Sequence, residues 1–361
     1  MNNFESLVSL NLIPQIGSVR LGELLKYFGE PQNIFKASRQ SLEPVVGGSI
    51  SQSIVSFDTG NLDRDLAQAK KAGLEIITLF DEGYPLNLKQ IPGLPIVLYV
   101  SGKITGFDNL SLGIVGSRRA SLYGLSSAEK FAAELALNNL TIVSGMARGV
   151  DTHAHHGALK VSGRTIAVMG SGFNHIYPPE NRGLADRISK SGAVVSEFPM
   201  DTKPLAQNFP RRNRLISGLS LGVLVTEAAR NSGALITVDF ALEQGREVFA
   251  LPGRIDSCGS MGTNDLLKQG AKLVTCSEDI LEELNPGISW ENDQTAPRGQ
   301  ENVSCVKEED LLYNCINREA MAIDELVEKA SLPISQISSL ILKLQFKKLI
   351  KELPGKQFIR S

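Results

Sequence analysis

The chain has 361 residues, of which 42% are hydrophobic and 21% charged, so it exceeds one small domain and lacks the composition of a disordered or rod-like chain. Lys and Arg number 37 against 39 Asp and Glu, a net charge of −2. Any binding of nucleic acid must therefore come from a local basic surface. Four cysteines without a CxxC pair, no export signal and no membrane-spanning apolar run predict a reduced, cytosolic protein.

The first 65 residues predict a small helical domain, with apolar side chains at helical spacing from Leu21 to Phe28. Two segments, Pro14–Gly17 and Val45–Gly48, each lead into a helical pattern. They are similar to helix-hairpin-helix or SAM-like repeats, whose hairpin amides can hold a nucleic-acid phosphate. A tight turn between helices that needs glycine for its geometry explains the same residues equally well.

Residues 66–284 predict an α/β domain. Short apolar runs rich in β-branched residues alternate with amphipathic stretches, which is typical of a parallel sheet covered by helices on both faces. The fold class is therefore a Rossmann-like doubly wound parallel sheet, with its ligand site at the carboxyl ends of the strands. The predicted strands lie near residues 76–79, 112–115, 141–143, 165–169, 193–195, 221–225, 247–251 and 271–274.

The turn after the second of these runs has the residues of a phosphate site. Gly116 and Ser117 end a strand and open a helix, where unpaired backbone N–H groups and the helix dipole favour an anion. Arg118 stands where a dinucleotide fingerprint needs its second glycine, and the chain has no GxxxxGK[ST] element, so no cofactor is expected. Arg118 and Arg119 instead suit the clamping of a phosphate. Pairing of both arginines with acidic neighbours is the alternative.

A second basic cluster strengthens the phosphate interpretation. Cations at a helix start oppose the helix dipole, so an anionic ligand is expected to offset their cost. If this cluster and the first turn face one groove, a polyanion rather than a mononucleotide is the expected ligand. The cluster consists of Lys203, Phe209, Arg211, Arg212, Asn213 and Arg214.

Three of the four histidines lie together but do not predict a metal site. On a helix His153 and His156 share a face, whereas His155 points nearly opposite. His155 is therefore predicted to be packed and to pair with Asp151, which also caps the helix. No metal and no catalytic residue are expected here.

One carboxylate keeps an enzymatic alternative open. Glu227 ends a predicted strand, and Ser232 with Gly233 then starts a helix that takes a phosphate or is merely capped. A Rossmann-like nucleotide-monophosphate hydrolase of the phosphoribohydrolase type would need a carboxylate general acid, and Glu227 is the candidate.

The C-terminal residues predict a linker over 285–303 and a winged-helix domain over 304–361. Three helical stripes are followed by two short apolar runs, Leu349–Ile350 and Phe358–Ile359, which flank Pro354-Gly355 as a hairpin. The last twenty residues are basic, which suits a solvated tail, duplex binding or a protein contact.

The ordered blocks of the chain resemble the DprA/Smf family of DNA-processing proteins. The blocks include GSRRASLYG, SGMARGVDTHAH, TIAVMGSGFNHIYPPEN, FPRRNRLISGLS and SGALITVDFALEQGREVFALPG, and they cover most of the length. The resemblance implies a single-stranded DNA-binding protein, without catalytic turnover, that protects incoming DNA in natural transformation. It also implies loading of the recombinase RecA and a homodimer through the Rossmann-like domain.

The same resemblance assigns DNA contacts by motif. Ser117, Arg118, Lys203, Arg211, Asn213 and Arg214 match the DNA-contacting positions, and Gly145 and Gly233 lie in adjoining motif loops. Together with the residues singled out by their chemistry, the predicted DNA- and phosphate-binding set is Gly116, Ser117, Arg118, Arg119, Gly145, Lys203, Phe209, Arg211, Arg212, Asn213, Arg214, Ser232 and Gly233.

Overall fold

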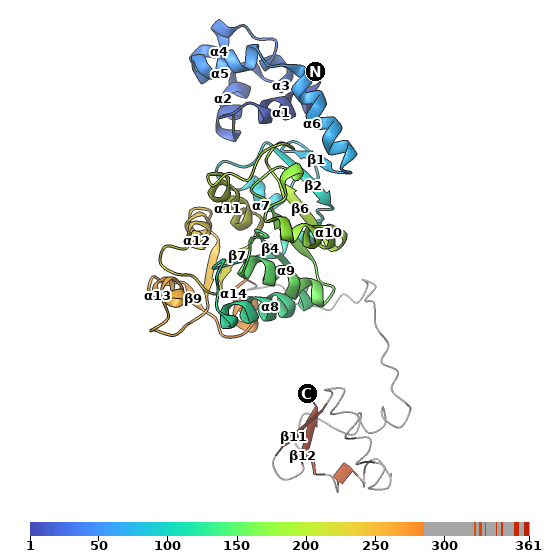
Figure 1. The fold of residues 1–361 in the computed structure, drawn as a ribbon, viewed down its shortest axis with the longest axis vertical. Coiled ribbons are helices and arrows are strands. Elements are labelled where there is room, and N and C mark those ends of the chain that lie inside the picture. The colour runs from blue at the N-terminus through green and yellow to red at the C-terminus, as the bar shows by residue number, and fades with distance from the viewer. Residues whose placement is uncertain are drawn as a thin grey trace. The chain divides into compact units, whose positions relative to one another are not determined.

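The computed structural model describes residues 1–284 and, beyond them, positions 321–322, 325–326, 329, 337, 341, 350–353 and 357–360 (Figure 1). The chain forms two compact units, residues 1–288 and residues 289–361. The predicted linker lies outside the described residues. Within the described part, no helix has the length and apolar character needed to cross a membrane.

The chain begins with six helices, as the apolar spacing predicts. The first is closed by a capping box, in which the Asn2 side chain accepts from the Glu5 amide and the Glu5 carboxylate accepts from the Asn2 amide. Gly47, at a φ of 81°, forms the sharp turn between the fourth and fifth helices. The helices are α1 (Asn3–Leu12), α2 (Ser18–Phe28), α3 (Pro31–Ile34), α4 (Arg39–Val46), α5 (Gly48–Val55) and α6 (Thr59–Lys71).

A nine-stranded sheet follows, in the order β1-β2-β6-β5-β4-β3-β7-β8-β9. In this spatial order, all strands from β6 through β3 to β9 pair in parallel with their neighbours. This confirms the predicted fold class. The strands are β1 (Glu75–Thr78), β2 (Val97–Gly102), β3 (Ser111–Val115), β4 (Thr141–Ser144), β5 (Thr165–Val168), β6 (Ala193–Ser196), β7 (Gly222–Val225), β8 (Glu247–Ala250) and β9 (Lys272–Leu273).

One strand departs from the predicted pattern: β2 is not among the predicted strands, and it runs opposite to both of its neighbours. β1 pairs antiparallel with β2, and β2 pairs antiparallel with β6. The connection between β1 and β2 holds only the short helix α7 (Leu86–Lys89), so no covering crossover helix joins the two strands. The sheet is therefore a parallel core extended by an antiparallel pair.

Helices cover both faces of the parallel core. Alternation along β3 directs Leu112 and Ile114 to one face and Val115 to the other, because successive strand residues point to opposite sides. The first face packs against Phe131 and Ala154 of two covering helices. The remaining helices are α8 (Leu122–Leu137), α9 (Val150–Lys160), α10 (Arg182–Ser191), α11 (Asn208–Leu219), α12 (Gly233–Glu243), α13 (Met261–Lys268) and α14 (Glu278–Leu284), with 3-10 turns η1 (Gly106–Asn109), η2 (Phe173–His175), η3 (Pro179–Asn181) and η4 (Cys258–Ser260).

The N-terminal helices pack against the antiparallel extension of the sheet. Leu7 and Leu10 of α1 share a core with Tyr99 of β2, and the Tyr99 hydroxyl donates to the Asp65 carboxylate at 2.6 Å. Burial raises the pKa of that carboxyl. The domain boundary predicted at residue 65 falls inside α6, which continues to Lys71.

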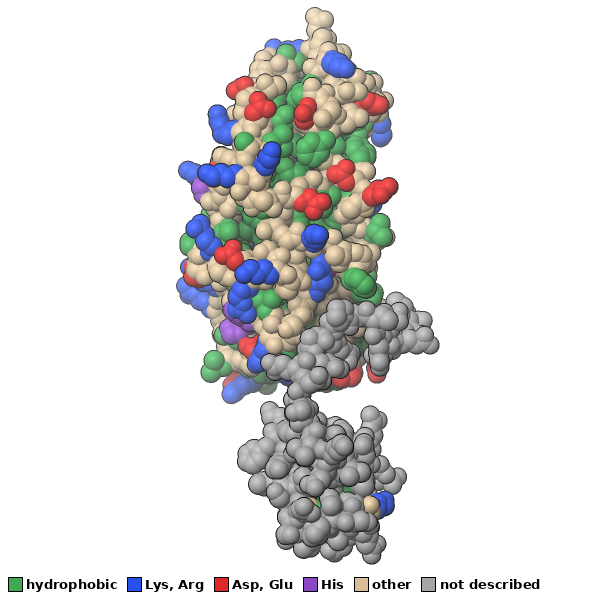
Figure 2. Space-filling view, turned by 90° about the vertical axis from the view of Figure 1, so that its right-hand side faces the viewer, with side chains coloured by type: hydrophobic (Ala, Val, Ile, Leu, Met, Phe, Trp, Pro, Cys, Tyr) green, Lys and Arg blue, Asp and Glu red, His purple; other side chains and the backbone are tan. Residues whose placement is uncertain are grey.

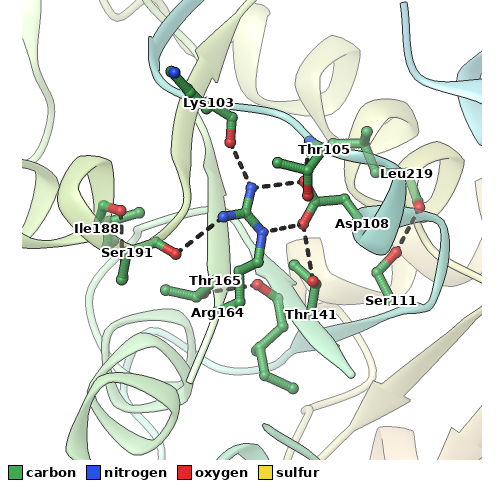
Figure 3. Close-up of polar contacts among 11 residues, drawn as sticks. Lys103, Thr105, Asp108, Ser111, Thr141, Arg164, Thr165, Ile188, Ser191 and Leu219 are labelled. Atoms are coloured by element: carbon green, nitrogen blue, oxygen red, sulfur yellow. Dashed lines mark hydrogen bonds and ion pairs between the residues drawn. The ribbon is translucent and has the colours of Figure 1, made fainter. Parts of the chain in front are cut away.

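A buried ion pair closes the amino end of the sheet (Figure 3). Arg164, just before β5, donates to both carboxylate oxygens of Asp108 at 2.7 and 2.8 Å. The same guanidinium donates to the carbonyls of Lys103 and Ser191, and Asp108 also accepts from Thr141. All of these groups therefore satisfy one another where the strands begin.

The second unit contains a three-stranded sheet, β10 (Met321–Ala322), β12 (Gln357–Arg360) and β11 (Ile350–Leu353) in spatial order. β11 and β12 pair antiparallel, so the predicted hairpin is confirmed. Leu326, Ile337 and Ile341 are helical and buried. The rest of the three predicted helices lies outside the described residues.

Candidate functional site

The strand order reverses at β3, and a cleft opens there. The chain proceeds from β3 to β4, β5 and β6 on one side, then returns to place β7 on the other side. Loops leaving neighbouring strands diverge at such a point, which makes it the usual ligand site of an open α/β sheet. The cleft has a volume of about 720 Å³. Its lining comprises residues 115–119, Ala147, Asp151, Tyr177, Pro204, Ala206, Phe209, Pro210, Arg212, Asn213, Ile216, 232–234, Ile236 and Thr237.

The turn after β3 forms one wall of this cleft. The Ser117 amide donates to the Glu227 carbonyl at 2.7 Å, which ties the turn to the loop after β7. Gly116 has no room for a side chain, since a Cβ would lie 2.7 Å from Val150. Arg118 and Arg119 are exposed, and within the described part of the chain their side chains make no ion pair. The alternative that Arg118 and Arg119 pair with acidic neighbours is therefore wrong as far as the described residues go.

An aromatic ring lies between two of the arginines. The Arg118 guanidinium carbon is 5.2 Å from the centre of the Phe209 ring, and that of Arg212 is 5.9 Å away. Tyr177 packs on the same ring with centres 5.7 Å apart. The two basic clusters of the sequence thus meet in one cleft around Phe209.

Arg212 forms the floor of the cleft. Its Nη1 donates to the carbonyls of Gly145 and Val168, and burial lowers the pKa of the guanidinium to about 10. Arg212 therefore stays protonated at neutral pH as a fixed positive charge. A Cβ on Gly145 would lie 2.3 Å from Arg212, so this glycine makes room for the guanidinium. Gly145 also borders a smaller pocket beside the cleft.

A carboxylate lies in the same cleft. Asp151 is buried and accepts from the Ala147 amide at 3.2 Å, and burial raises the pKa of this carboxyl despite the nearby charges of Arg212 and Arg118. The predicted pairing of His155 with Asp151 is wrong, because His155 bonds to Thr165 at 2.7 Å while Asp151 turns back to its own loop. His155 is fully buried, as predicted.

Four of the predicted contacts do not line the cleft: Gly145, which makes room for Arg212, and the basic residues Lys203, Arg211 and Arg214. Arg214 pairs with the buried Glu197 carboxylate. The Arg211 guanidinium lies 5.2 Å from the Phe198 ring, and Lys203 is exposed just before the lining residue Pro204. Successive residues on α11 point about 100° apart, so one helix face supplies Arg212 and Asn213 while Arg211 and Arg214 point elsewhere.

The loop before α12 forms the opposite wall. Ser232 caps its own helix by accepting from the Ala234 amide at 3.3 Å, and the Gly233 carbonyl accepts from Asn213 at 3.2 Å. Of the two predicted roles of this loop, helix capping and phosphate binding, the structure shows the capping. Its contact with a phosphate stays a prediction.

Glu227, the candidate general acid, points away from the cleft. Its carboxylate accepts from the Ser121 amide at 2.9 Å and from the Ser121 hydroxyl, at the start of α8. It is buried and does not border the cleft. Among the described residues no group of three His, Cys, Asp or Glu side chains could hold a metal ion.

Several cleft residues were not predicted as part of the site, among them Tyr177 and Asp151. Tyr177 follows β5 in the run Tyr177-Pro178-Pro179, and Asp151 was assigned to helix capping and to pairing with His155. Both come after parallel strands, so their position at the carboxyl edge of the sheet was a usable signal.

Charge on the molecule is also unevenly spread: on the face shown in Figure 2, Lys and Arg gather at the lower left and Asp and Glu mostly at the upper right.

Fold and cleft together define a Rossmann-like protein with an arginine-lined cleft at its topological switch point. A family model described as DNA recombination-mediator protein A matches residues 75–285, and a DprA winged helix domain model matches residues 295–356. Protein Smf of Escherichia coli (strain K12) is 43% identical over 311 residues, covering 84% of this chain and 82% of that protein. The chain belongs to the DprA/Smf family.

Other relatives agree with this assignment. DNA processing protein DprA of Bacillus subtilis is 44% identical over 224 residues, 62% of this chain and 75% of that protein. The X-ray structure of Streptococcus pneumoniae DprA superposes with a TM-score of 0.69 at 33% identity, covering 78% of this chain and 99% of that one. A Helicobacter pylori DNA processing protein A structure, described for its single-stranded DNA binding mode, has a TM-score of 0.53 at 31% identity over 58% and 95% of the two chains.

Proposed function

We propose that this protein binds single-stranded DNA in the cleft at the switch point. The carrying observation is that Arg118 and Arg119 of the β3 turn, exposed and without an ion pair among the described residues, share one cleft with Phe209 and the buried charge of Arg212. The arginines and the turn amides hold phosphates, and Phe209 offers a stacking surface for a base. The single-stranded DNA binding described for the H. pylori relative supports this proposal.

The proposed activity is binding without catalytic turnover. A phosphoribohydrolase would need a carboxylate beside the sugar, and Glu227 is engaged with Ser121 outside the cleft lining. Asp151 does border the cleft, but it lies near the charges of Arg212 and Arg118, which an anionic ligand would contact. No observation on the described residues favours the hydrolase over the binder.

The proposed biological role is that of a recombination mediator. Membership of the DprA/Smf family supports protection of incoming DNA in natural transformation, loading of RecA, and a homodimer through the Rossmann-like domain in the cytoplasm. Of the three basic residues of the cluster outside the cleft lining, Lys203 and Arg211 are exposed and remain proposed DNA contacts beside it, whereas Arg214 pairs with Glu197.

Titration of labelled oligothymidine and of the matching duplex tests the binding proposal. Four phosphates neutralised on a single strand would lower affinity roughly fiftyfold between about 50 and 200 mM salt. Arg118→Ala is expected to weaken binding and to reduce the slope of log K against log salt by about 0.7. Arg187→Ala is the matched control, since Arg187 is exposed on α10 and does not border the cleft.

Two results would contradict the proposal. One is retention of oligothymidine at full affinity by Arg118→Ala combined with Arg119→Ala. The other is release of free base from a nucleotide monophosphate, abolished by Glu227→Gln. The RecA proposal is tested separately, by whether the full chain shortens the lag before RecA hydrolyses ATP on strands covered by single-strand-binding protein.

The winged-helix unit has its own test. Two hypotheses exist for residues 304–361, duplex binding and contact with a protein partner. Deletion of these residues is expected to lower affinity for the duplex or for RecA while oligothymidine affinity stays unchanged. A deletion that alters neither duplex nor partner binding rejects both hypotheses.

A further inference from the structure

Three exposed apolar side chains come shortly after the cleft-lining turn of β3 or lie in a loop that is hydrogen-bonded to that segment. They are Leu122 and Tyr123, in the first turn of α8, and Ile255 in the loop after β8, with exposed fractions of 85%, 51% and 93%. We call these three residues the Tyr123 surface. Apolar side chains this exposed, in segments joined to a charged ligand site, are candidates for binding.

The Tyr123 ring is held in place although it is exposed. Its hydroxyl donates to the Pro252 carbonyl at 3.1 Å, which joins α8 to the loop that carries Ile255. The preceding Ser121 is fixed by two hydrogen bonds to Glu227. Gly124 packs so tightly on the same Glu227 that an added Cβ would lie 2.7 Å from its carboxylate. A rigid ring loses little conformational entropy when it binds a ligand.

The position of the ring indicates its ligand. Arg119, which borders the cleft, is exposed and lies in the same turn that leads to Tyr123. A strand whose phosphate is held by this turn continues past it, so its next bases reach the first turn of α8. The nearby Arg254 and Asp256 pair with each other and leave no net charge beside the ring. An uncharged flat surface beside a phosphate site suits a nucleobase.

We propose that Tyr123 stacks on a base of the bound strand outside the cleft, with Leu122 and Ile255 as its apolar flanks. This inference rests on the proposed single-stranded DNA binding and extends its footprint across the β3 turn. The strand then lies across two loops, with one base against Phe209 and another against Tyr123. Stacking accepts every base, so this contact adds affinity without sequence preference.

The test compares oligothymidine of about twelve nucleotides with strands in which the bases of one half are replaced by abasic sugars. Tyr123→Ala is expected to weaken oligothymidine binding about ten- to a hundredfold with an unchanged salt slope, because a stacked base and not a phosphate contact is lost. Tyr123→Phe keeps the ring and is expected to retain most of the affinity. Tyr27→Ala, which removes an even more exposed tyrosine on α2, is the control.

The abasic strands separate stacking from a structural effect. The wild-type protein is expected to lose affinity on both half-abasic strands, on one because the base at Phe209 is missing and on the other because the base at Tyr123 is missing. Tyr123→Ala is expected to bind the second of these strands as well as the wild type does. If Tyr123→Ala weakens both strands equally, or weakens neither because the surface serves a protein partner, the inference is overturned. If the wild type binds no single strand at all, it is the proposed function itself that fails.

Discussion

Arg164 and Arg118 lie at opposite ends of the central sheet and have opposite surroundings. At the amino end, Arg164 donates to both oxygens of Asp108 and to two carbonyls (Figure 3). At the carboxyl end, Arg118 is exposed, rests on Phe209 and has no carboxylate partner among the described residues. The Arg164 guanidinium donates its hydrogen bonds to groups of the protein, whereas the exposed Arg118 guanidinium can donate to a ligand.

The difference shows how the same residue type serves folding and binding. A buried charge is tolerated when every donor is satisfied, and removing its partner then leaves an uncompensated charge inside the protein. An exposed guanidinium contributes little to stability but keeps its full capacity to bind phosphate. The polar network is therefore expected to govern unfolding at one end of the sheet and ligand binding at the other.

The largest expected effect is on stability at the amino end. Arg164→Ala leaves the buried Asp108 carboxylate without its ion pair and is expected to cost about 3–5 kcal/mol. Arg118→Ala is expected to change stability by no more than about 0.5 kcal/mol, because its side chain is exposed. Urea unfolding of both variants, followed by circular dichroism, measures the contrast.

A double variant is the control for this comparison. Arg164→Ala combined with Asp108→Leu removes both charges and is expected to recover part of the lost stability. Equal destabilisation by Arg164→Ala and Arg118→Ala would show that the two ends do not differ as argued. Loss of oligothymidine affinity in the folded Arg164→Ala protein would likewise contradict the division of roles.

The local patterns predicted the sheet and the turn after β3 well, because strand runs and helix starts are coded by neighbouring residues. The strand β2, which pairs antiparallel with β1, was not predicted, although Val97 to Val100 form an apolar run. The partner of each arginine in the second cluster is set by contacts far away in sequence. Arg214 forms an ion pair with Glu197, and Arg212 donates to the carbonyl of Val168. Such partners are set by tertiary packing and leave no periodic signal.

The next effect concerns pH and again the amino half of the sheet. Burial lowers the pKa of His155 to about 3, whereas the unfolded chain has a pKa near 6.5. Between these values the unfolded state binds one proton more than the folded state, so stability is full above about pH 6.5 and is lost as the pH falls. The expected loss is about 1.4 kcal/mol per pH unit.

His155→Gln isolates this contribution. The variant has no imidazole to titrate, so the difference in stability between it and the wild type is expected to shrink steadily as the pH is lowered from about 6.5 to 4.5. Urea midpoints at several pH values supply the measurement. A constant difference over that window would mean that His155 does not carry the pH dependence. Oligothymidine affinity at neutral pH serves as the control, because His155 does not border the cleft.

The smallest effect concerns the carboxylate within the cleft. Asp151 opposes a bound phosphate when it is ionised, and burial raises the pKa of this carboxyl, so lowering the pH through that pKa removes the repulsion. Asp151→Asn is expected to bind oligothymidine about three- to tenfold more tightly at neutral pH.

The pH dependence distinguishes this repulsion from a change of shape. Thymine and phosphodiester groups keep their charge between about pH 5 and 8, so a rise in wild-type affinity toward acid that is absent in Asp151→Asn must come from the Asp151 carboxyl. Asparagine can still accept from the Ala147 amide and so preserves the loop. By linkage, the bound phosphate also favours the protonated carboxyl, so Asp151 takes up a proton as the strand binds. Weaker binding by Asp151→Asn would show instead that the carboxylate supports the arginines of the cleft more than it repels the ligand.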